Sequence, residues 1–261
     1  MPQPATNRGS DALAAALEFQ RGTRERTADR MWAIDGGWVA LTPSLPTAYV
    51  ANTVELAGRV TYDEAIAVTE EHMRDLPHRQ LTIDDAATAR QLTPRFVADG
   101  WTVDRDLVMA LSRPLDREVD TAAVCESGEG ESSRLMAEWI SDVPSIEPHR
   151  IDQVVELTRR EARTRNAREL GVLADDGAVV AMTKLYSDGS TAQVEGVYTS
   201  PAWRGRGYGR ALVARAIAIA QDGGHELVFV CADDEGWPKQ LYAKLGFDPV
   251  GRIIRFHRDV G

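Results

Sequence analysis

The chain has 261 residues, of which 43% are hydrophobic and 27% charged, as in an ordinary globular protein. Its 30 Lys and Arg residues stand against 40 Asp and Glu residues, which gives a formal net charge of −10. This balance argues against a dedicated binder of nucleic acid or of an anionic membrane, because both need broad positive surface. It leaves room for a small basic pocket. The length predicts one large domain or two small ones.

Few residues suggest metal binding, disulfide bonds or export. Cys125 and Cys231 are the two cysteines, and the five histidines show no paired spacing, so we expect neither a disulfide framework nor a metal site. The segment Met1–Pro4 has no basic region followed by an apolar stretch, and no run of residues is apolar enough to span a membrane. These features predict a cytoplasmic protein.

The first half of the chain alternates between helical and strand patterns. Thr61 and Glu64 have the spacing of a capping box at the start of one helix, and Asp85 is a good N-cap for another. In chain order the expected elements are a helix at 12–20, strands at 32–40 and 48–55, a helix at 61–76, a strand at 79–83, a helix at 85–98 and a strand at 101–111.

A comparable series follows in the second half. Two Asp-Gly pairs, at Gly177 and Gly189, predict hairpin turns between three strands. The expected elements are a strand at 117–124, a loop at 125–133, helices at 133–142 and 151–165, strands at 167–174, 178–186 and 191–199, a helix at 209–220, a strand at 227–232, a helix at 238–245 and a strand near 252–257. The alternation predicts a mixed α/β fold.

The two halves end alike. Residues 92–111 give a helix, then Gly100-Trp101, then a strand, and residues 241–257 give a helix, then Gly246-Phe247, then a strand. This match favours a tandem repeat of one fold. The alternative is one continuous α/β domain with an N-terminal extension.

One short segment differs in charge and glycine content from the rest of the chain. After the strand at 191–199, Gly205, Gly207 and Gly209 alternate with larger residues just before a helix. Alternating glycines let successive amides point into one concavity, and a helix N-terminus adds about half a positive charge. Residues 194–215 hold four Arg and one Glu, a net +3. The segment predicts an anion site suited to a pyrophosphate.

These residues resemble a known family. Arg204-x-x-Gly207-x-Gly209 is similar to the signature of the GNAT (GCN5-related) N-acetyltransferases, and the later segment 241–247, Leu-Tyr-Ala-Lys-Leu-Gly-Phe, resembles a second element of that family. The likeness covers about residues 117–257. The first half resembles a degenerate copy that lacks the glycine loop.

The resemblance implies a fold and a co-substrate. The fold is a mixed, mostly antiparallel central sheet flanked by helices, in tandem, with a degenerate domain at 1–114 and a catalytic domain at 115–261. The co-substrate is acetyl-CoA, and no metal is implied. The residues implied to bind it are Val197, Tyr198, Thr199, Arg204, Gly205, Arg206, Gly207, Tyr208, Gly209 and Arg210.

Two residues are candidates for the proton transfers of such a reaction. Tyr242 stands where the family usually has its general acid, although it could simply fill the space between helix and sheet. Glu195 lies two residues before Val197, so strand alternation puts both on one face, and it is the first candidate for the base. A ladder partner is the structural alternative for Glu195. The run Asp233, Asp234 and Glu235 is the second candidate for the base, and Glu235 stands where many family members carry Asn.

The predicted function is transfer of an acetyl group to a primary amine, a small molecule or a peptide, by direct attack, since no cysteine lies in the site segment. The alternative is a non-catalytic acyl-CoA-binding regulatory module. A nucleotide-phosphate binder is disfavoured because the Lys-Ser/Thr of a P-loop is missing. No nucleic-acid or membrane partner is expected, and the protein is predicted to be a monomer or homodimer.

One further group of charges is expected to be structural. Five arginines on or near the helix at 151–165 have Glu156 and Glu161 at helical spacing, which predicts a solvated, salt-bridged face and not a nucleic-acid site. These arginines are Arg159, Arg160, Arg163, Arg165 and Arg168. Trp139 and Ile140 could wall an acceptor groove or pack in the core.

Overall fold

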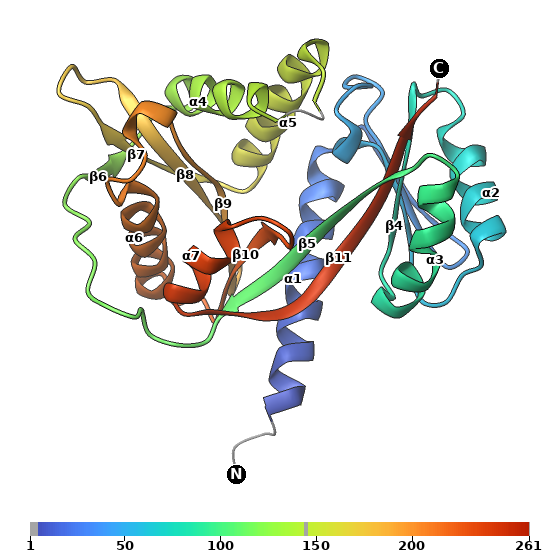
Figure 1. Ribbon diagram of the computed structural model, residues 1–261, viewed down its shortest axis with the longest axis horizontal. Helices are drawn as coiled ribbons and strands as arrows, with labels where there is room; N and C mark the ends of the chain where they lie inside the picture. Colours follow the sequence, from blue (N-terminus) through green and yellow to red (C-terminus); the bar gives the residue numbers. More distant parts are fainter. Residues whose placement is uncertain (1–4, 144–145, 261) are drawn as a thin grey trace.

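The computed structural model describes residues 5–143 and 146–260 and contains a mixed sheet with helices on both of its faces (Figure 1). Met1–Pro4, on which the leader expectation rests, lie outside the described residues. The strands are β1 (Arg30–Ile34), β2 (Gly37–Leu41), β3 (Thr53–Leu56), β4 (His78–Ile83), β5 (Thr102–Leu111), β6 (Val124–Glu126), β7 (Arg168–Leu173), β8 (Val179–Asp188), β9 (Thr191–Thr199), β10 (Leu227–Asp233) and β11 (Phe247–Asp259).

The helices follow the alternation expected from the sequence. They are α1 (Ala5–Thr27), α2 (Tyr62–Met73), α3 (Ala86–Ala98), α4 (Glu129–Ser141), α5 (Ile151–Thr164), α6 (Tyr208–Asp222) and α7 (Pro238–Lys244), with 3-10 turns η1 (Tyr49–Ala51), η2 (Pro148–Arg150) and η3 (Pro201–Trp203). Within the described ranges, no helix is both long and apolar enough to cross a membrane.

The described strands form one continuous sheet in the order β1-β2-β3-β4-β11-β5-β10-β9-β8-β7-β6. Two neighbouring pairs, β3 with β4 and β9 with β10, are parallel, and the other described pairs are antiparallel. The expectation of a mixed, mostly antiparallel sheet flanked by helices is therefore confirmed.

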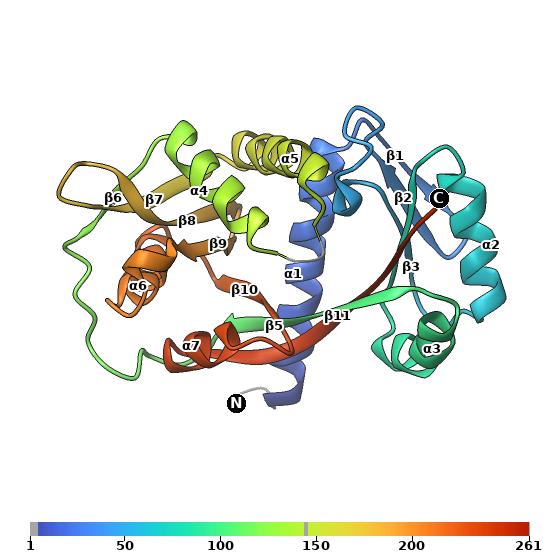
Figure 2. The same cartoon turned by 45° about the horizontal axis from the view of Figure 1, so that its top comes forward.

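The two halves of the chain exchange their last strands. β5, which ends the first half, lies between β10 and β11 of the second half, and β11 lies between β4 and β5 of the first. Figures 1 and 2 show β5 and β11 as a long crossing pair between the two lobes. The predicted division between residues 114 and 115 falls in the link after β5 and stays a prediction, since these ladders join the two sides of it.

Helix α1 lies across the middle of the sheet on one face (Figure 2). Ala16 and Phe19 pack in a buried cluster with Val108 of β5, Phe229 of β10 and Ile253 of β11. The helix is longer at both ends than the 12–20 expected from its apolar pattern. Tertiary contacts that no local pattern reveals support its second half.

Several of those contacts come from one buried arginine. Arg165, at the end of α5, donates from Nε to the hydroxyl of Thr23 at 2.8 Å and from a terminal nitrogen to the carbonyl of Phe19. Its guanidinium also lies 4.2 Å from the centre of the Phe19 ring. Only 1% of the Arg165 side chain is exposed, so its expected place on a solvated face is wrong.

Four local expectations differ from the structure. In the strand expected at 48–55, residues 49–51 form the 3-10 turn η1 and β3 begins only at Thr53. The strand expected at 32–40 is the hairpin β1–β2, which turns at Asp35-Gly36, and Gly36 has the positive φ of +72° that such a turn needs. The strand expected at 117–124 is an irregular link, and pairing with β7 begins only at Val124. The loop expected at 125–133 holds β6 and the first turn of α4.

Other local signals are confirmed. The hydroxyl of Thr61 accepts the Glu64 amide while the Glu64 carboxylate accepts the Thr61 amide, which completes the capping box of α2. The carboxylate of Asp85 accepts the amide of Thr88 at 2.7 Å and caps α3. A capping residue interacts with a residue three positions away, so the sequence alone is enough to predict the cap.

The strand exchange predicts that a residue of the second half stabilises the core of the first. Phe256 of β11 is fully buried among first-half residues and stacks on Phe96 with ring centres 4.1 Å apart. We expect Phe256→Ala to lower the free energy of unfolding by about 3–5 kcal/mol. Urea denaturation followed by tryptophan fluorescence and circular dichroism should show one shifted transition with both probes. Separate transitions for the two halves would contradict this.

Candidate functional site

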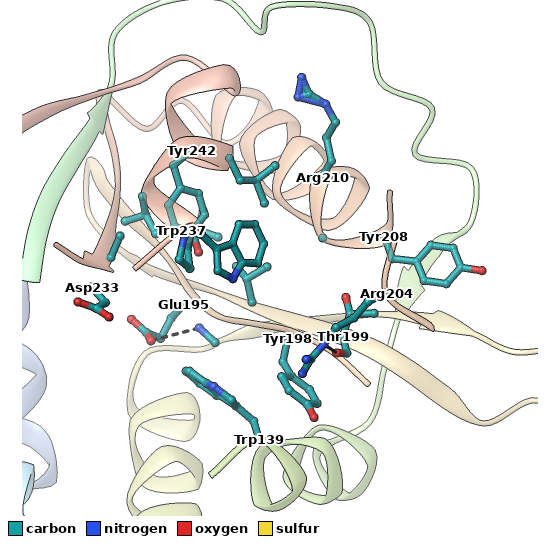
Figure 3. A pocket seen from close by; sticks show the side chains of 18 of the residues that line it. Trp139, Glu195, Tyr198, Thr199, Arg204, Tyr208, Arg210, Asp233, Trp237 and Tyr242 are labelled. Carbon is teal, nitrogen blue, oxygen red and sulfur yellow. Dashed lines mark hydrogen bonds between the residues drawn. The ribbon is translucent and has the colours of Figure 1, made fainter. Parts of the chain in front are cut away.

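A cavity of about 580 Å³ opens where β9 and β10 separate. These parallel strands pair from Thr191 with Leu227 to Val194 with Val230, and then diverge. The cavity is lined by residues 194–199, by the loop residues 203–205 and 207–210, by residues 230–233, and by the side chains of Trp139, Trp237, Pro238, Leu241 and Tyr242 (Figure 3).

A bulge in β9 causes the separation. Gly196 has a φ of +64°, and the register with β8 shifts between the pairs Lys184–Glu195 and Met182–Tyr198. A bulge bends its strand and ends regular pairing. A side chain at Gly196 would be strained by this φ, and its Cβ would lie 3.3 Å from the Met136 side chain. The bulge interrupts the alternation on which Glu195 was assigned, yet Glu195 and Val197 both line the cavity.

At one end of the cavity the glycine loop presents free amides. Gly205 and Gly207 have φ values of +78° and +83°, and Gly207 is the N-cap of the 15-residue helix α6. Among residues 5–143 and 146–260, the amides of residues 205–210 donate no hydrogen bond to another group of the chain. Because these free amides lie at the N-terminus of α6, where the helix dipole is positive, the loop can hold an anion.

The arginine side chains of this loop are mostly engaged elsewhere. Arg204 donates from Nε to the carbonyl of Thr199 at 3.0 Å, and Arg210 forms an ion pair with Asp116. Arg206 lies 4.5 Å over the ring of Trp203 and does not line the cavity, unlike the other residues predicted to bind the cofactor. The backbone amides therefore add their partial positive charges to those of the arginines at the loop.

Glu195 lies toward the other end of the cavity (Figure 3). One of its carboxylate oxygens accepts the amide of Gly196 at 3.1 Å, and the other accepts the side-chain amide of Gln193 at 2.6 Å. Burial raises the pKa of Glu195, and the nearby charge of Asp106 raises it further, against the lowering effect of these hydrogen bonds. A carboxylate with a raised pKa is a stronger base than an exposed one.

Tyr242 faces the same cavity from α7. Its side chain is 6% exposed and packs edge-on against Phe247, with ring centres 6.1 Å apart. Burial, together with the charge of Glu195, raises the pKa of Tyr242 above the usual value of a phenol. The hydroxyl therefore stays protonated at neutral pH and can donate a proton. The structure thus brings the two predicted catalytic residues to one cavity.

The alternative base candidates separate in space. Asp233 lines the cavity, and its carboxylate accepts the amide of Glu235 at 2.9 Å. Asp234 turns to Arg252, with 2.6 Å between Oδ2 and Nε. Glu235 forms a 3.2 Å ion pair with Arg105, and its side chain is 75% exposed. Of these three, Asp233 alone is in a position to act in the cavity.

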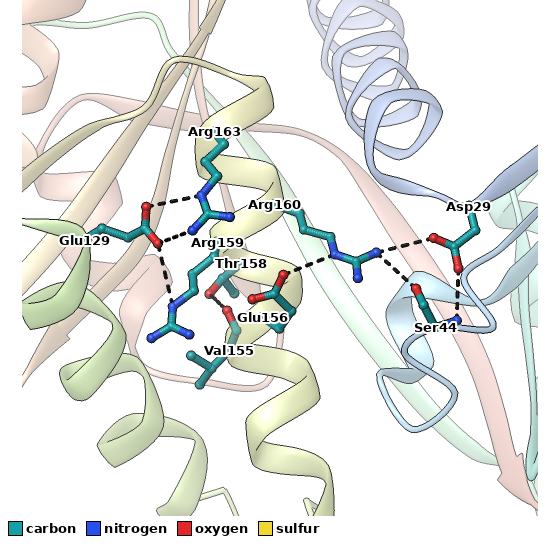
Figure 4. A network of polar contacts seen from close by, with 9 residues as sticks. All are labelled: Asp29, Ser44, Glu129, Val155, Glu156, Thr158, Arg159, Arg160 and Arg163. Carbon is teal, nitrogen blue, oxygen red and sulfur yellow. Dashed lines mark hydrogen bonds and ion pairs between the residues drawn. The ribbon is translucent and has the colours of Figure 1, made fainter.

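The outer face of α5 is salt-bridged, as expected (Figure 4). Arg160 pairs with Glu156 at 3.3 Å and with Asp29 at 3.4 Å, and Arg163 pairs with Glu129 at 2.7 Å. These arginines hold the helix to its neighbours, and their charge is largely compensated.

Glu161 on the same helix is a titratable residue near Glu195 that the sequence did not single out. It was expected on the solvated face, but it lies on the side of α5 that faces the sheet. Burial raises its pKa to about 7, and the charge of Glu195 contributes to that rise. No pattern in the sequence separates Glu161 from Glu156, because their different surroundings come from segments far away in the chain.

In the described part of the first half, the corresponding strands do not separate to form such a cavity. β3 and β4 stay paired through Leu56 and Ile83, so no gap opens between them. The helix that follows, α2, has the amide of its N-cap satisfied by the Glu64 carboxylate at 2.8 Å. The Glu64 carboxylate therefore lies at the N-terminus of α2, whereas the N-terminus of α6 in the second half has free amides. This agrees with a degenerate first half.

The raised pKa of Glu161 makes stability depend on pH. A carboxyl whose pKa is about 7 when folded and 4.5 ordinarily binds its proton more tightly in the folded chain. Its stabilising contribution is present below pH 4.5 and is lost as the pH rises to about 7. The free energy of unfolding of the wild type minus that of Glu161→Gln, from urea denaturation, should fall over this range and then level off. A difference that does not vary with pH would contradict the assignment. Glu156→Gln, on the face paired with Arg160, is the matched control.

Comparison with known proteins agrees with this geometry. Residues 134–247 match the model of the acetyltransferase (GNAT) family. No curated protein sequence matches the chain.

Several solved structures share the fold. A functionally unknown conserved protein from Staphylococcus epidermidis superposes with a TM-score of 0.66 at 13% identity, covering 90% of this chain and 95% of that one. A GCN5-related N-acetyltransferase from Kribbella flavida gives 0.61 at 17% identity, covering 100% and 97%. A tandem GNAT protein from the clavulanic acid biosynthesis pathway gives 0.54 at 16% identity, covering 86% and 78%.

At these identities the structural matches establish the fold, and the family model establishes the family of the matched segment. The separated strands, the glycine loop and the free helix N-terminus all lie within that segment. Residues 134–247 are a GNAT-family acetyltransferase domain, which supports acyltransferase activity, and the chain as a whole has the fold of GNAT proteins, among them a tandem one.

Proposed function

We propose that the second half transfers an acetyl group from acetyl-CoA to a primary amine. The observation that carries this proposal is that one cavity is lined by all the groups such a reaction needs. The free amides of residues 205–210 lie at one end of it, and Glu195 and Tyr242 lie toward the other (Figure 3). One elongated ligand can therefore place its anionic group at the loop and its reactive group near the Glu195 carboxylate and the Tyr242 phenol.

The loop fits the pyrophosphate of a coenzyme A. Six successive amides without acceptors are a donor set for phosphate oxygens, and Gly205 and Gly207 have open space where a Cβ would be. Beyond Val194, β9 has no partner on the β10 side, so its main chain is available to an extended amide-containing arm such as pantetheine. Acetyl-CoA supplies the activated thioester.

Glu195 is the proposed base. An amine is largely protonated at neutral pH and must lose a proton before it can attack a thioester. The raised pKa of Glu195 suits it to accept that proton, directly or through a water. Asp233 is the alternative on the same cavity. Both carboxylates also favour a cationic acceptor, a small molecule or a peptide amine.

Tyr242 is the proposed acid. A phenol of ordinary pKa, about 10, can protonate a departing thiolate of pKa about 8.5 in a modestly uphill transfer, and the raised pKa of Tyr242 makes that transfer more uphill. The burial that raises the pKa of Tyr242 keeps its proton in place until the sulfur develops negative charge. No covalent enzyme intermediate is proposed, because the burial that raises the pKa of Cys231 also keeps this cavity-lining thiol from acting as a nucleophile.

One observation favours a second candidate, a non-catalytic acyl-CoA-binding module. Glu235, in the place where many family members carry Asn, is paired with Arg105 outside the cavity. The amide contact of those members is therefore missing. Binding without turnover would leave Glu195 and Tyr242 with no role in catalysis.

Release of thiol from acetyl-CoA in the presence of a panel of amines tests the proposal. We expect Glu195→Gln and Tyr242→Phe each to lower kcat by about 10²–10⁴, the usual contribution of general acid–base catalysis. The acid limb of the wild-type pH profile should lie above the range of an ordinary glutamate and disappear in Glu195→Gln. Glu226→Gln, at an exposed position, is the charge-matched control. Tight binding of CoA with no turnover on any amine would favour the binding module.

A second prediction concerns the anion loop. Gly207→Glu places a carboxylate beside the free amides and should abolish CoA binding in isothermal titration calorimetry. Gly224→Glu is the matched control, because Gly224 has a similar φ, +76° against +83°, equally open surroundings, and lies beyond the other end of α6. Equal loss in both variants, or retained affinity in Gly207→Glu, would mean that the loop is not the phosphate site.

A further inference from the structure

A second cavity, of about 510 Å³, lies between α1 and the sheet of the first half. Three of its lining residues form a row across neighbouring strands: Trp38 of β2 is the cross-strand partner of Glu55 of β3, which is the partner of Thr82 of β4. Cross-strand partners point to the same face of a sheet. Asp84, two residues beyond Thr82, lines the same cavity.

Two of these residues offer acceptor atoms that the chain does not use. Thr82 is 3% exposed, and its hydroxyl has no hydrogen-bond partner among the described residues. In the same part of the chain, no hydrogen bond or ion pair holds the Asp84 carboxylate, and Arg24 and Arg21 act on it only at longer range. A buried hydroxyl without a partner costs free energy unless a ligand or water satisfies it.

The charges of the cavity leave negative charge in excess. Arg24 of α1 pairs with Glu55, with 3.1 Å between Nη1 and Oε1, and Arg21 pairs with Glu25 at 3.3 Å. Asp84 and Glu18, which also line the cavity, remain without such a partner. Desolvation raises the pKa of both Glu55 and Asp84. A cation in the cavity would relieve this excess.

Apolar side chains form another part of the lining. Ala14 and Leu17 of α1 and Ile253 of β11 face the cavity beside the row of acceptors. The indole of Trp38 adds an aromatic face, and the guanidinium of Arg24 already lies 5.7 Å from its centre. A ligand with a positive head and a short hydrocarbon tail matches this division of the walls.

The two halves of the chain carry these carboxylates at corresponding places. Glu55 and Glu195 each follow a valine on the first strand of a parallel pair. Asp84 directly follows the second strand, β4, and Asp233 ends the corresponding strand, β10. In its described residues, the first half lacks the glycine loop and the gap between the strands, but it carries acidic groups at corresponding places.

We infer that the first half binds a small primary alkylamine, whose ammonium group donates to Glu55, Asp84 and Thr82 while its alkyl chain lies along Leu17 and Ile253. An ammonium has three N–H donors, and these three side chains supply acceptors from adjacent strands. The inference does not depend on acetyl transfer, because it rests on a cavity that shares no lining residue with the first one.

The test uses the full chain labelled with ¹⁵N and n-butylammonium as the probe. The six tryptophans give separate indole signals, and Trp38→Phe assigns the one in this cavity. We expect n-butylammonium to shift the Trp38 signal saturably, and neutral 1-butanol to leave it in place. Signals of Trp139 and Trp237, which line the other cavity, report binding there.

Variants separate this site from the acceptor site. Asp84→Asn should weaken the titration of the Trp38 signal at least tenfold, and Thr82→Val should weaken it several-fold. Glu71→Gln, an exposed residue of the same half, and Asp233→Asn, in the other cavity, should leave it unchanged. Shifts confined to Trp139 and Trp237, no saturable shift of Trp38, or an unchanged affinity in Asp84→Asn would overturn the inference. The spectrum itself shows whether each variant is folded.

Discussion

The reciprocal placement of β5 and β11 is the constraint on which the rest of the structure depends. Each strand completes the sheet of the half to which it does not belong in sequence, so neither sheet is whole without the other half. The ladders that β5 and β11 form contribute backbone hydrogen bonds and buried apolar side chains at the junction between the halves. Helix α1 then covers the junction on one face. The cavity of the second half opens beside β10, so its geometry depends on a strand supplied by the first half.

That dependence extends to the chemistry of the site. Asp106 of β5 raises the pKa of Glu195, and Asp106 is itself held by Arg255 of β11. The charge of Arg255 lowers the pKa of Glu195 in turn, as do the hydrogen bonds from Gly196 and Gln193 of β9. The basicity of one carboxylate is therefore set by groups from three separate segments. The first half contributes to the cavity of the second through strand pairing and through charge.

The anion loop shows how an acidic chain can be suited to an anionic ligand. The net charge of the protein is −10, and the loop arginines are engaged by a backbone carbonyl, by Asp116 and by Trp203. Free amides and the end of α6 add positive potential at the loop itself. Potential from fixed dipoles is short-ranged and directional, so it selects a small anion at one place and gives little attraction to a polyanion.

Local signals in the sequence determined the alternation of elements, the capping of α2 and α3, the glycine loop and the place of Tyr242 after it. All of these act between residues a few positions apart, and a single sequence contains them completely. The tertiary structure alone decided the strand exchange, the inward turn of Glu161 and the burial of Arg165. Each of these depends on which distant segment becomes a neighbour, and the free energy that selects that neighbour comes from burial and pairing over the whole sheet. The sequence carried the chemistry of the site, and the fold decided the surroundings that tune it.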